Sequence, residues 1–159
     1  QTIAFVQAND QFWQRTTLEG HLTGSAWVLS PDQSQVLLIH HAKLDRWLQP
    51  GGHADATDES LLETARREAQ EECGMAHLTL LQPGIFDIDI HTIPTKGHEP
   101  EHLHYDIRFV FSTDNQAENA HDQLEIKAVQ WVPVETLQKE SVPSSLRRMA
   151  LKTALSTPE

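Results

Sequence analysis

Three glutamates are spaced so that they could act together: Glu71 and Glu72 lie three and four residues after Glu68. On a helix these spacings bring the side chains to one face, where like charges repel by roughly 0.2–0.5 kcal/mol a pair. A divalent cation would reverse that repulsion, and carboxylates on neighbouring turns suit Mg²⁺, which takes further ligands from water and substrate phosphates. The alternative is a solvated acidic face, which is the commoner origin of such a cluster.

The segment around these glutamates carries the start and stop signals of an amphipathic helix. Ser60 is a good N-cap, and Glu63 three residues later completes a capping box. Gly74 stands where a helix C-terminus needs a residue that tolerates left-handed geometry. We therefore predict a helix over 61–73. The residues expected on its packing side are Leu62, Ala65, Ala69 and Cys73.

The stretch from Gly51 to Met75 resembles the Nudix box. The family pattern is a glycine, five residues, a glutamate, seven residues and then Arg-Glu-aliphatic-x-Glu-Glu-x-Gly-aliphatic. The second half fits, because Glu59 is followed by seven residues and then by REAQEECGM, which begins at Arg67. The first half differs, because six residues instead of five separate Gly52 from Glu59. The resemblance thus implies a Nudix domain whose glycine loop carries one extra residue.

The resemblance also implies a metal cofactor, Mg²⁺ or Mn²⁺. Its ligands would be Glu68, Glu71 and Glu72, joined by the backbone carbonyl of Gly51. Such ions neutralise and orient phosphates and lower the pKa of bound water. The three glutamates would therefore form the catalytic centre of a hydrolase.

Hydrolysis further needs a group that takes a proton from water. The resemblance offers Glu68 and, as the alternative, Glu125, an acid a few residues before Trp131 in a later predicted strand. Arg67 has another role in the family, in which it pairs with the glutamate at the position of Glu59. A guanidinium fork suits that pairing, which would fix the loop against the helix.

Ten histidines are many for 159 residues, and two of them, His91 and His104, fall on two segments whose polar residues alternate with apolar ones. In segments 86–91 and 103–109 the acids and histidines share one face of a strand. If the two strands pair, His91 and His104 join one polar patch, and His53 of the glycine loop can complete it. We expect these three histidines to bind substrate phosphates or a second metal. The alternative is a sheet with one solvated face.

The rest of the chain predicts the elements that position these residues. Helices are expected near 3–13 and after Pro143, and strands at 21–30, 36–40, 86–91, 103–109 and 125–133, the first two as a hairpin. This order predicts a layered α/β fold with a mixed β-sheet. The resemblance names it the Nudix α/β/α sandwich. No linker interrupts the chain, so we expect a single domain over 1–159.

Composition limits the partners. A net charge of −11 argues against a large nucleic-acid surface, although it permits a small phosphorylated substrate when metal ions neutralise the site. No apolar run approaches the length of a membrane span, and one cysteine excludes an internal disulfide and fits a reducing compartment, so a cytoplasmic location without membrane contact is expected. A homodimer is the default oligomer.

The predicted function is metal-dependent hydrolysis of a phosphoanhydride bond in a nucleoside diphosphate linked to another moiety. Trp47, just before the glycine pair, is a candidate to stack on the base, with core packing as its alternative. One rival is a nucleotide-sensing module that does not cleave, but such modules usually lose box glutamates. The other rival is a diphosphate isomerase, suggested by the Gly52-His53 step. Those enzymes carry a cysteine where this chain has Gly51.

Overall fold

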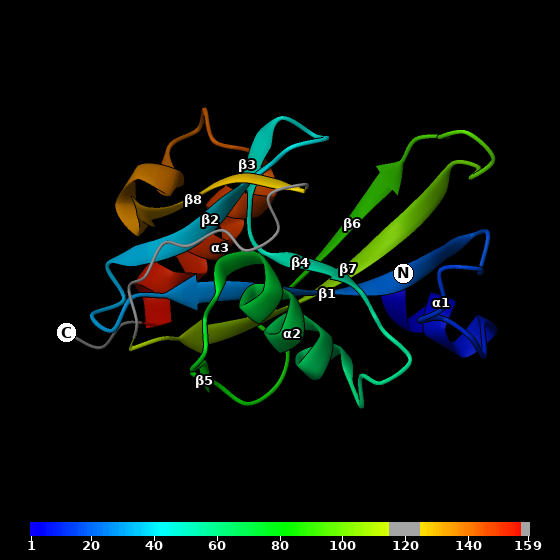
Figure 1. Cartoon of the computed structure of the whole chain (residues 1–159), viewed down its shortest axis with the longest axis horizontal. Coiled ribbons are helices and arrows are strands. Elements are labelled where there is room, and N and C mark those ends of the chain that lie inside the picture. Colours follow the sequence, from blue (N-terminus) through cyan, green and yellow to red (C-terminus); the bar gives the residue numbers. More distant parts are fainter. Residues whose placement is uncertain (115–124, 157–159) are drawn as a thin grey trace.

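An eight-stranded mixed sheet organises the chain in this computed structural model, which describes residues 1–114 and 125–156. Its strands are β1 (Gly20–Leu29), β2 (Gln35–His41), β3 (Arg46–Leu48), β4 (Gly51–His53), β5 (Thr79–Leu80), β6 (Asp87–Ile93), β7 (His102–Ser112) and β8 (Ile126–Pro133). The helices are α1 (Thr2–Ala8), α2 (Leu61–Cys73) and α3 (Ser144–Ser156), with a 3₁₀ turn η1 (Val134–Gln138). Figure 1 shows α2 on one side of the sheet and α3 on the other. The predicted α/β/α arrangement is confirmed.

The strand order places β1 at the centre. The main path is β3-β2-β1-β7-β5, while β4 pairs with β1, β6 with β7 and β8 with β2. The strands β1 and β7 run parallel, in register from Gly20–Leu103 to Leu29–Ser112. The predicted pairing of β6 with β7 is confirmed, and it sets His91 opposite His104.

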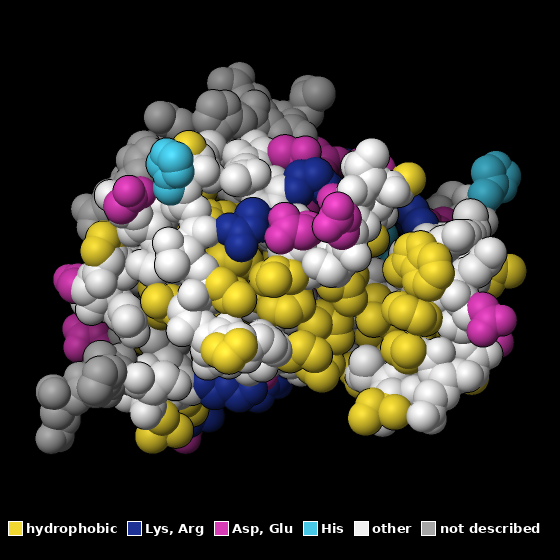
Figure 2. Space-filling view, turned by 90° about the horizontal axis from the view of Figure 1, so that it is seen from below, with side chains coloured by type: hydrophobic (Ala, Val, Ile, Leu, Met, Phe, Trp, Pro, Cys, Tyr) yellow, Lys and Arg dark blue, Asp and Glu magenta, His cyan; other side chains and the backbone are white. Residues whose placement is uncertain are grey.

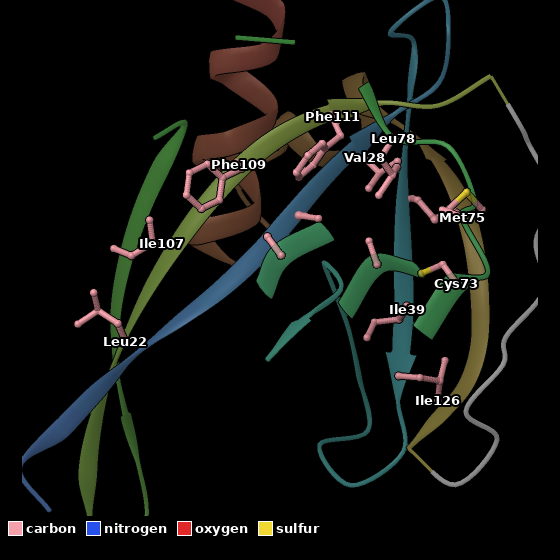
Figure 3. Close-up of a cluster of buried hydrophobic side chains, with 14 of the residues drawn as sticks. Leu22, Val28, Ile39, Cys73, Met75, Leu78, Ile107, Phe109, Phe111 and Ile126 are labelled. Carbon is pink, nitrogen blue, oxygen red and sulfur yellow. The ribbon is translucent and has the colours of Figure 1, made fainter. Parts of the chain in front are cut away.

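Helix α2 has the bounds that its sequence predicts. The hydroxyl of Ser60 accepts a hydrogen bond from the Glu63 amide at 3.3 Å, and Gly74 ends the helix in left-handed geometry with φ of 67°. Buried α2 residues, Ala65, Ala69 and Cys73 among them, pack into a core with one face of the sheet. Figure 3 shows Cys73 among side chains of that core.

The opposite sheet face packs against α3. Its core holds Trp27 and Leu29 of β1 together with Met149 and Ala150 of the helix, all buried. The indole of Trp27 donates a hydrogen bond to the Thr153 hydroxyl at 2.9 Å. Successive residues of β1 therefore alternate between the two cores, as a strand buried on both faces requires.

Helix α1 is shorter than the sequence predicts. It ends at Ala8, and the expected apolar positions Phe12 and Trp13 lie in turns beyond it. The side chain of Asn9 donates to the Phe5 carbonyl at 3.0 Å, a local bond that competes with further helix. Phe5 stacks on Tyr105 of β7 with ring centroids 4.3 Å apart.

Figure 2 views the molecule from below relative to Figure 1, and it shows apolar side chains gathered on that surface. Ile3 and Leu18 are 75% and 69% exposed. Exposed apolar surface favours contact with a partner, and the homodimer stays a prediction. No helix in the described ranges is long and apolar enough to cross a membrane.

Candidate active site

The glycine pair of β4 lies directly against the glutamates of α2. The Gly51 amide donates a hydrogen bond to Oε2 of Glu72 at 3.0 Å, and Glu72 is 8% exposed. A Cβ atom on Gly52 would stand 2.6 Å from Oε1 of Glu68, closer than real contacts allow. Two carboxylates thus reach the β4 backbone, Glu72 through the Gly51 amide and Glu68 through the space that the missing side chain of Gly52 leaves.

Arg67 connects the loop after β4 to the helix. Its Nε and Nη2 donate to the two carboxylate oxygens of Asp58 at 3.0 and 2.9 Å, and Nη2 also donates to the His53 carbonyl at 3.0 Å. Its Nη1 donates to Glu68 Oε1 and to Glu71 Oε2, both at 3.1 Å. One guanidinium therefore holds the loop and two of the predicted catalytic glutamates.

The predicted pairing of Arg67 with Glu59 is wrong. Glu59 is exposed, and the carboxylate that binds Arg67 belongs to Asp58, whose side chain is 6% exposed. Asp58 follows Gly52 after five residues, so it keeps the family spacing from the glycine, and the extra residue lies between the acid and Arg67. The guanidinium bonds lower the pKa of Asp58 to about 2, so this carboxylate stays charged.

Glu68 has the electrostatics of a proton acceptor. Burial raises the pKa of its carboxyl above the ordinary value, Arg67 opposes that rise, and the charge of Glu71 adds to it. The carboxylate of Glu71 is more exposed, at 59% against 16% for that of Glu68. A base works best when its pKa lies near the working pH, so the shift of the Glu68 pKa is in the direction that a general base needs.

The donor set of these glutamates fits a hard divalent cation. Glu68, Glu71 and Glu72 offer carboxylate oxygens from adjacent turns of α2, which is the chemistry that Mg²⁺ and Mn²⁺ prefer. The contacts of Glu68 and Glu72 with β4 place the backbone of Gly51 beside the carboxylates. A small phosphorylated ligand could therefore share an ion with this cluster.

A family model of the NUDIX domain matches residues 21–152. The chain belongs to the NUDIX domain family. This confirms, at the level of the family, the Nudix hydrolase predicted from the sequence. No curated protein sequence matches the chain.

Solved NUDIX structures share the fold. A MutT NUDIX hydrolase from Burkholderia pseudomallei has a TM-score of 0.62 at 16% identity, over 84% of this chain and 97% of that chain. A NUDIX-family hydrolase from Clostridium perfringens has a TM-score of 0.62 at 20% identity, over 86% and 98%. The NUDIX domain of Shewanella oneidensis NrtR, complexed with ADP ribose, has a TM-score of 0.60 at 18% identity, over 98% and 97%. At these identities the likeness concerns the fold alone.

Two residues predicted for the NUDIX site, Glu125 and Trp47, make contacts outside the box. Glu125 directly precedes β8, and its carboxylate pairs with Lys43 at 2.8 Å, in the turn between β2 and β3. Trp47 lies on β3, packs half-buried against the core on the α3 side, and its ring centroid is 5.1 Å from that of His40. That packing agrees with the core alternative for Trp47, and the role of Glu125 stays a prediction.

The predicted histidine patch forms, and His21 and His102 also belong to it. Ring nitrogens of His21, His53 and His104 lie within 4.8 Å of one another, and His102 and His91 flank His104. Sequence reasoning missed His21, because only the parallel register of β1 with β7 brings it opposite His104. Burial lowers the pKa of His21 to about 4 and that of His104 to about 2, and burial also lowers the pKa of His53. These three rings are therefore neutral at pH 7.

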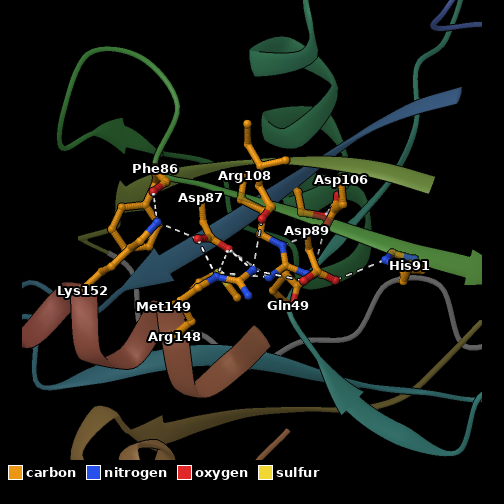
Figure 4. Close-up of polar contacts among 12 residues, drawn as sticks. Gln49, Phe86, Asp87, Asp89, His91, Asp106, Arg108, Arg148, Met149 and Lys152 are labelled. Atoms are coloured by element: carbon orange, nitrogen blue, oxygen red, sulfur yellow. Dashed lines mark hydrogen bonds and ion pairs between the residues drawn. The ribbon is translucent and has the colours of Figure 1, made fainter. Parts of the chain in front are cut away.

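The acids of the same sheet face are bound mainly by basic side chains, although Asp89 also lies 3.3 Å from Nδ1 of His91. Asp87 accepts from Arg148 Nη2 at 2.7 Å and from Lys152 Nζ at 2.6 Å, and Arg108 joins it to Asp106 (Figure 4). Bonds from α3 outweigh the burial of Asp87 and hold its pKa below the ordinary value. This end of the face is thus an ion-pair network that ties α3 to the sheet.

Proposed function

We propose that the chain is a NUDIX hydrolase that cleaves a phosphoanhydride bond in a nucleoside diphosphate linked to another moiety. The observation that carries this proposal is the meeting of Glu68 and Glu72 with the glycine pair of β4. That meeting gathers acidic oxygens along the β4 backbone, and a side chain at Gly52 would block the approach of Glu68. The single buried cysteine fits a reducing compartment such as the cytoplasm.

Glu68, Glu71, Glu72 and the carbonyl of Gly51 are the residues that would hold Mg²⁺ or Mn²⁺. When bound, the ion supplies charge neutralisation at the phosphates and lowers the pKa of water. The chain's own contribution is to hold these oxygens in place. Arg67 does so for Glu68 and Glu71, and the Gly51 amide does so for Glu72.

Proton transfer is assigned to Glu68. Its carboxylate is mostly buried, its pKa is raised by that burial, and its bond to Arg67 orients it. The water that attacks phosphorus must lose a proton, and a carboxylate with a raised pKa accepts it more readily than an exposed one. Glu125 is the second candidate, and its ion pair with Lys43 would have to open before it could act.

The substrate class is argued from the site and from the range of its structural neighbours. These neighbours include a complex with ADP ribose, an Ap4A hydrolase and a dihydroneopterin triphosphate pyrophosphohydrolase, and all three compounds contain phosphoanhydrides. His91 is exposed and lies opposite His104, on the sheet face that points away from α2, so its contact with substrate phosphates stays a prediction. Trp47 stays a candidate for base stacking.

The two rival functions are weaker. A non-cleaving sensor does not need the box glutamates, and all three are present. The isomerase reading needs a cysteine at position 51, and a Cβ there would stand 2.7 Å from the Cα of Ser25. Cys73 cannot replace it, because burial raises the pKa of its thiol and keeps it protonated.

Phosphate release from a substrate panel tests the proposal. The panel contains ADP ribose, Ap4A and nucleoside triphosphates, each with Mg²⁺ or Mn²⁺ and a coupling phosphatase. We expect metal-dependent turnover of a nucleoside diphosphate derivative such as ADP ribose. Binding of these compounds by the folded, metal-loaded protein without turnover of any of them would overturn the hydrolase and support the sensor.

A further inference from the structure

The histidine cluster combines side chains from three neighbouring strands. His21 comes from β1, His53 from β4 and His104 from β7, and β1 lies between the other two. Their ring centroids are 4.9 Å apart for His21 and His53, 4.7 Å for His21 and His104, and 5.0 Å for His53 and His104. Three imidazoles from separate segments thus converge on one small volume.

His21 has no hydrogen-bond partner in the part of the chain that the structure describes. The side chain is fully buried, and neither Nδ1 nor Nε2 meets a donor or an acceptor there. A neutral imidazole carries one donor and one acceptor, and buried polar atoms of native proteins are almost always paired. The rings of His53, His102 and His104 surround that of His21 at centroid distances of 4.9, 5.0 and 4.7 Å, so a partner for its lone-pair nitrogen belongs in the middle of the cluster.

His102 is oriented as a metal ligand would be. Its Nδ1 lies 2.9 Å from the Pro100 carbonyl, which can only accept, so Nδ1 carries the proton and Nε2 keeps its lone pair. Metal-binding histidines usually donate their second ring N–H to a carbonyl or carboxylate in this way.

The free lone pair of His102 faces another ring nitrogen. Its Nε2 is 3.3 Å from Nε2 of His104. An ion held tetrahedrally at metal–nitrogen distances of about 2.0–2.1 Å spaces its ligands about 3.3–3.4 Å apart. The observed separation therefore suits two ligands of one ion.

We propose that His21, His53, His102 and His104 bind one transition-metal cation of the Zn²⁺ type. Neutral imidazole nitrogens suit Zn²⁺ and its neighbours in the first row, whereas Mg²⁺ prefers oxygen. A site with four protein ligands is closed and structural. Such an ion would tie the short strand β4 to β1 and β7.

This site is separate from the glutamates of the box. A Cβ on Gly52 points toward Glu68, whereas a Cβ on Gly51 points toward the Ser25 side chain, on the other sheet face. Side chains alternate along a strand, so His53 shares the face of Gly51 and points away from α2. The histidine ion and the ion of the glutamates would thus lie on opposite faces of β4.

The test uses Co²⁺ as a coloured substitute for Zn²⁺ in the full chain, stripped of metal with a chelator and kept in excess Mg²⁺ so that the glutamates are occupied. A nitrogen-rich tetrahedral site gives strong visible Co²⁺ absorption. We expect one such Co²⁺ per chain, loss of the colour when Zn²⁺ is added, and a higher Tm with Zn²⁺ than without it.

Variants separate the two sites. His53→Gln should weaken Co²⁺ binding at least tenfold, since it removes a ring and leaves the His53 carbonyl for Arg67. His98→Gln, at an exposed loop histidine, is the matched control and should bind as the wild type does. Glu72→Gln should also keep the coloured site. Absence of a coloured site in the wild type, its persistence in His53→Gln, or its loss in Glu72→Gln would overturn the proposal.

Discussion

The guanidinium of Arg67 holds the carboxylate of Asp58 through two nitrogens, at 3.0 and 2.9 Å. The carboxylate is also bonded by the Thr64 hydroxyl and by the Asp55 amide, both at 2.9 Å. This one acid therefore closes the loop between β4 and α2, and through Arg67 it fixes the position of Glu68 and Glu71. The stability of the loop and the geometry of the candidate site depend on the same pair.

Asp58→Asn should lower the free energy of unfolding by about 1–3 kcal/mol, because a mostly buried, charge-assisted set of hydrogen bonds is weakened. Glu59→Gln is the matched control, since this neighbouring acid is exposed, and it should change stability by less than about 0.5 kcal/mol. Urea unfolding of both variants measures the difference. Equal effects would mean that Asp58 does not have the role assigned to it.

Gly52→Ala should reduce activity much more than stability. The new Cβ meets only the end of the flexible Glu68 side chain, at 2.6 Å from Oε1, so the carboxylate can move aside at little cost. That movement displaces a predicted metal ligand and base. Gly51→Ala should instead destabilise the fold, because its Cβ would stand 2.7 Å from the Cα of Ser25. Thermal unfolding and turnover, measured on both variants, distinguish the two outcomes; full activity in Gly52→Ala would remove Glu68 from the site.

The ion pairs of Asp87 predict how stability depends on pH. Its folded pKa lies below the unfolded value of about 3.9, so its contribution is complete above that pH and is lost as the pH falls through the folded pKa. Arg148→Met removes the bond at 2.7 Å and should lower stability by about 1–3 kcal/mol at pH 7, with a smaller deficit at pH 3.

Arg147→Met supplies the control for that pH profile. Arg147 is the preceding residue on α3 and donates to the Gln138 carbonyl at 3.0 Å, a bond that involves no titrating acid. Loss of this hydrogen bond should lower the free energy of unfolding by the same amount at pH 7 and at pH 3. If the deficit of Arg148→Met were also independent of pH, the Asp87 carboxylate would not be its significant partner.

Local signals predicted the elements of this fold well where the determinants are close in sequence. Ser60 and Gly74 set the two ends of α2, and both ends are where the sequence placed them. The pairing of β6 with β7 followed from two neighbouring alternating segments. The N-terminal helix was predicted too long, because the apolar pattern continues past Ala8 whereas the Asn9 side chain bonds the Phe5 carbonyl and competes with further helix.

Features that depend on distant contacts were not predictable. The parallel register of β1 with β7 joins His21 to His104, which lie far apart in the chain, and no local pattern encodes it. The choice of Asp58 over Glu59 depends on how the loop turns onto α2. Likewise, the acids of segment 86–91 were expected on one polar face with the histidines, and no local pattern shows that Arg148 and Lys152 of α3 bind Asp87.

The most direct test of the hydrolase is metal-dependent phosphate release by Glu72→Gln, compared with the wild type on the substrate that the panel identifies. The amide oxygen of glutamine can still accept from the Gly51 amide, so the fold should persist while the charge is lost. Glu63→Gln, which alters an exposed acid of the same helix, is the control.

We predict that Glu72→Gln lowers kcat by at least about a hundredfold, the scale on which losing one stabilising group at developing charge acts. Glu63→Gln should retain wild-type turnover. A folded Glu72→Gln protein with unchanged turnover would contradict the assignment of the box glutamates as the catalytic centre.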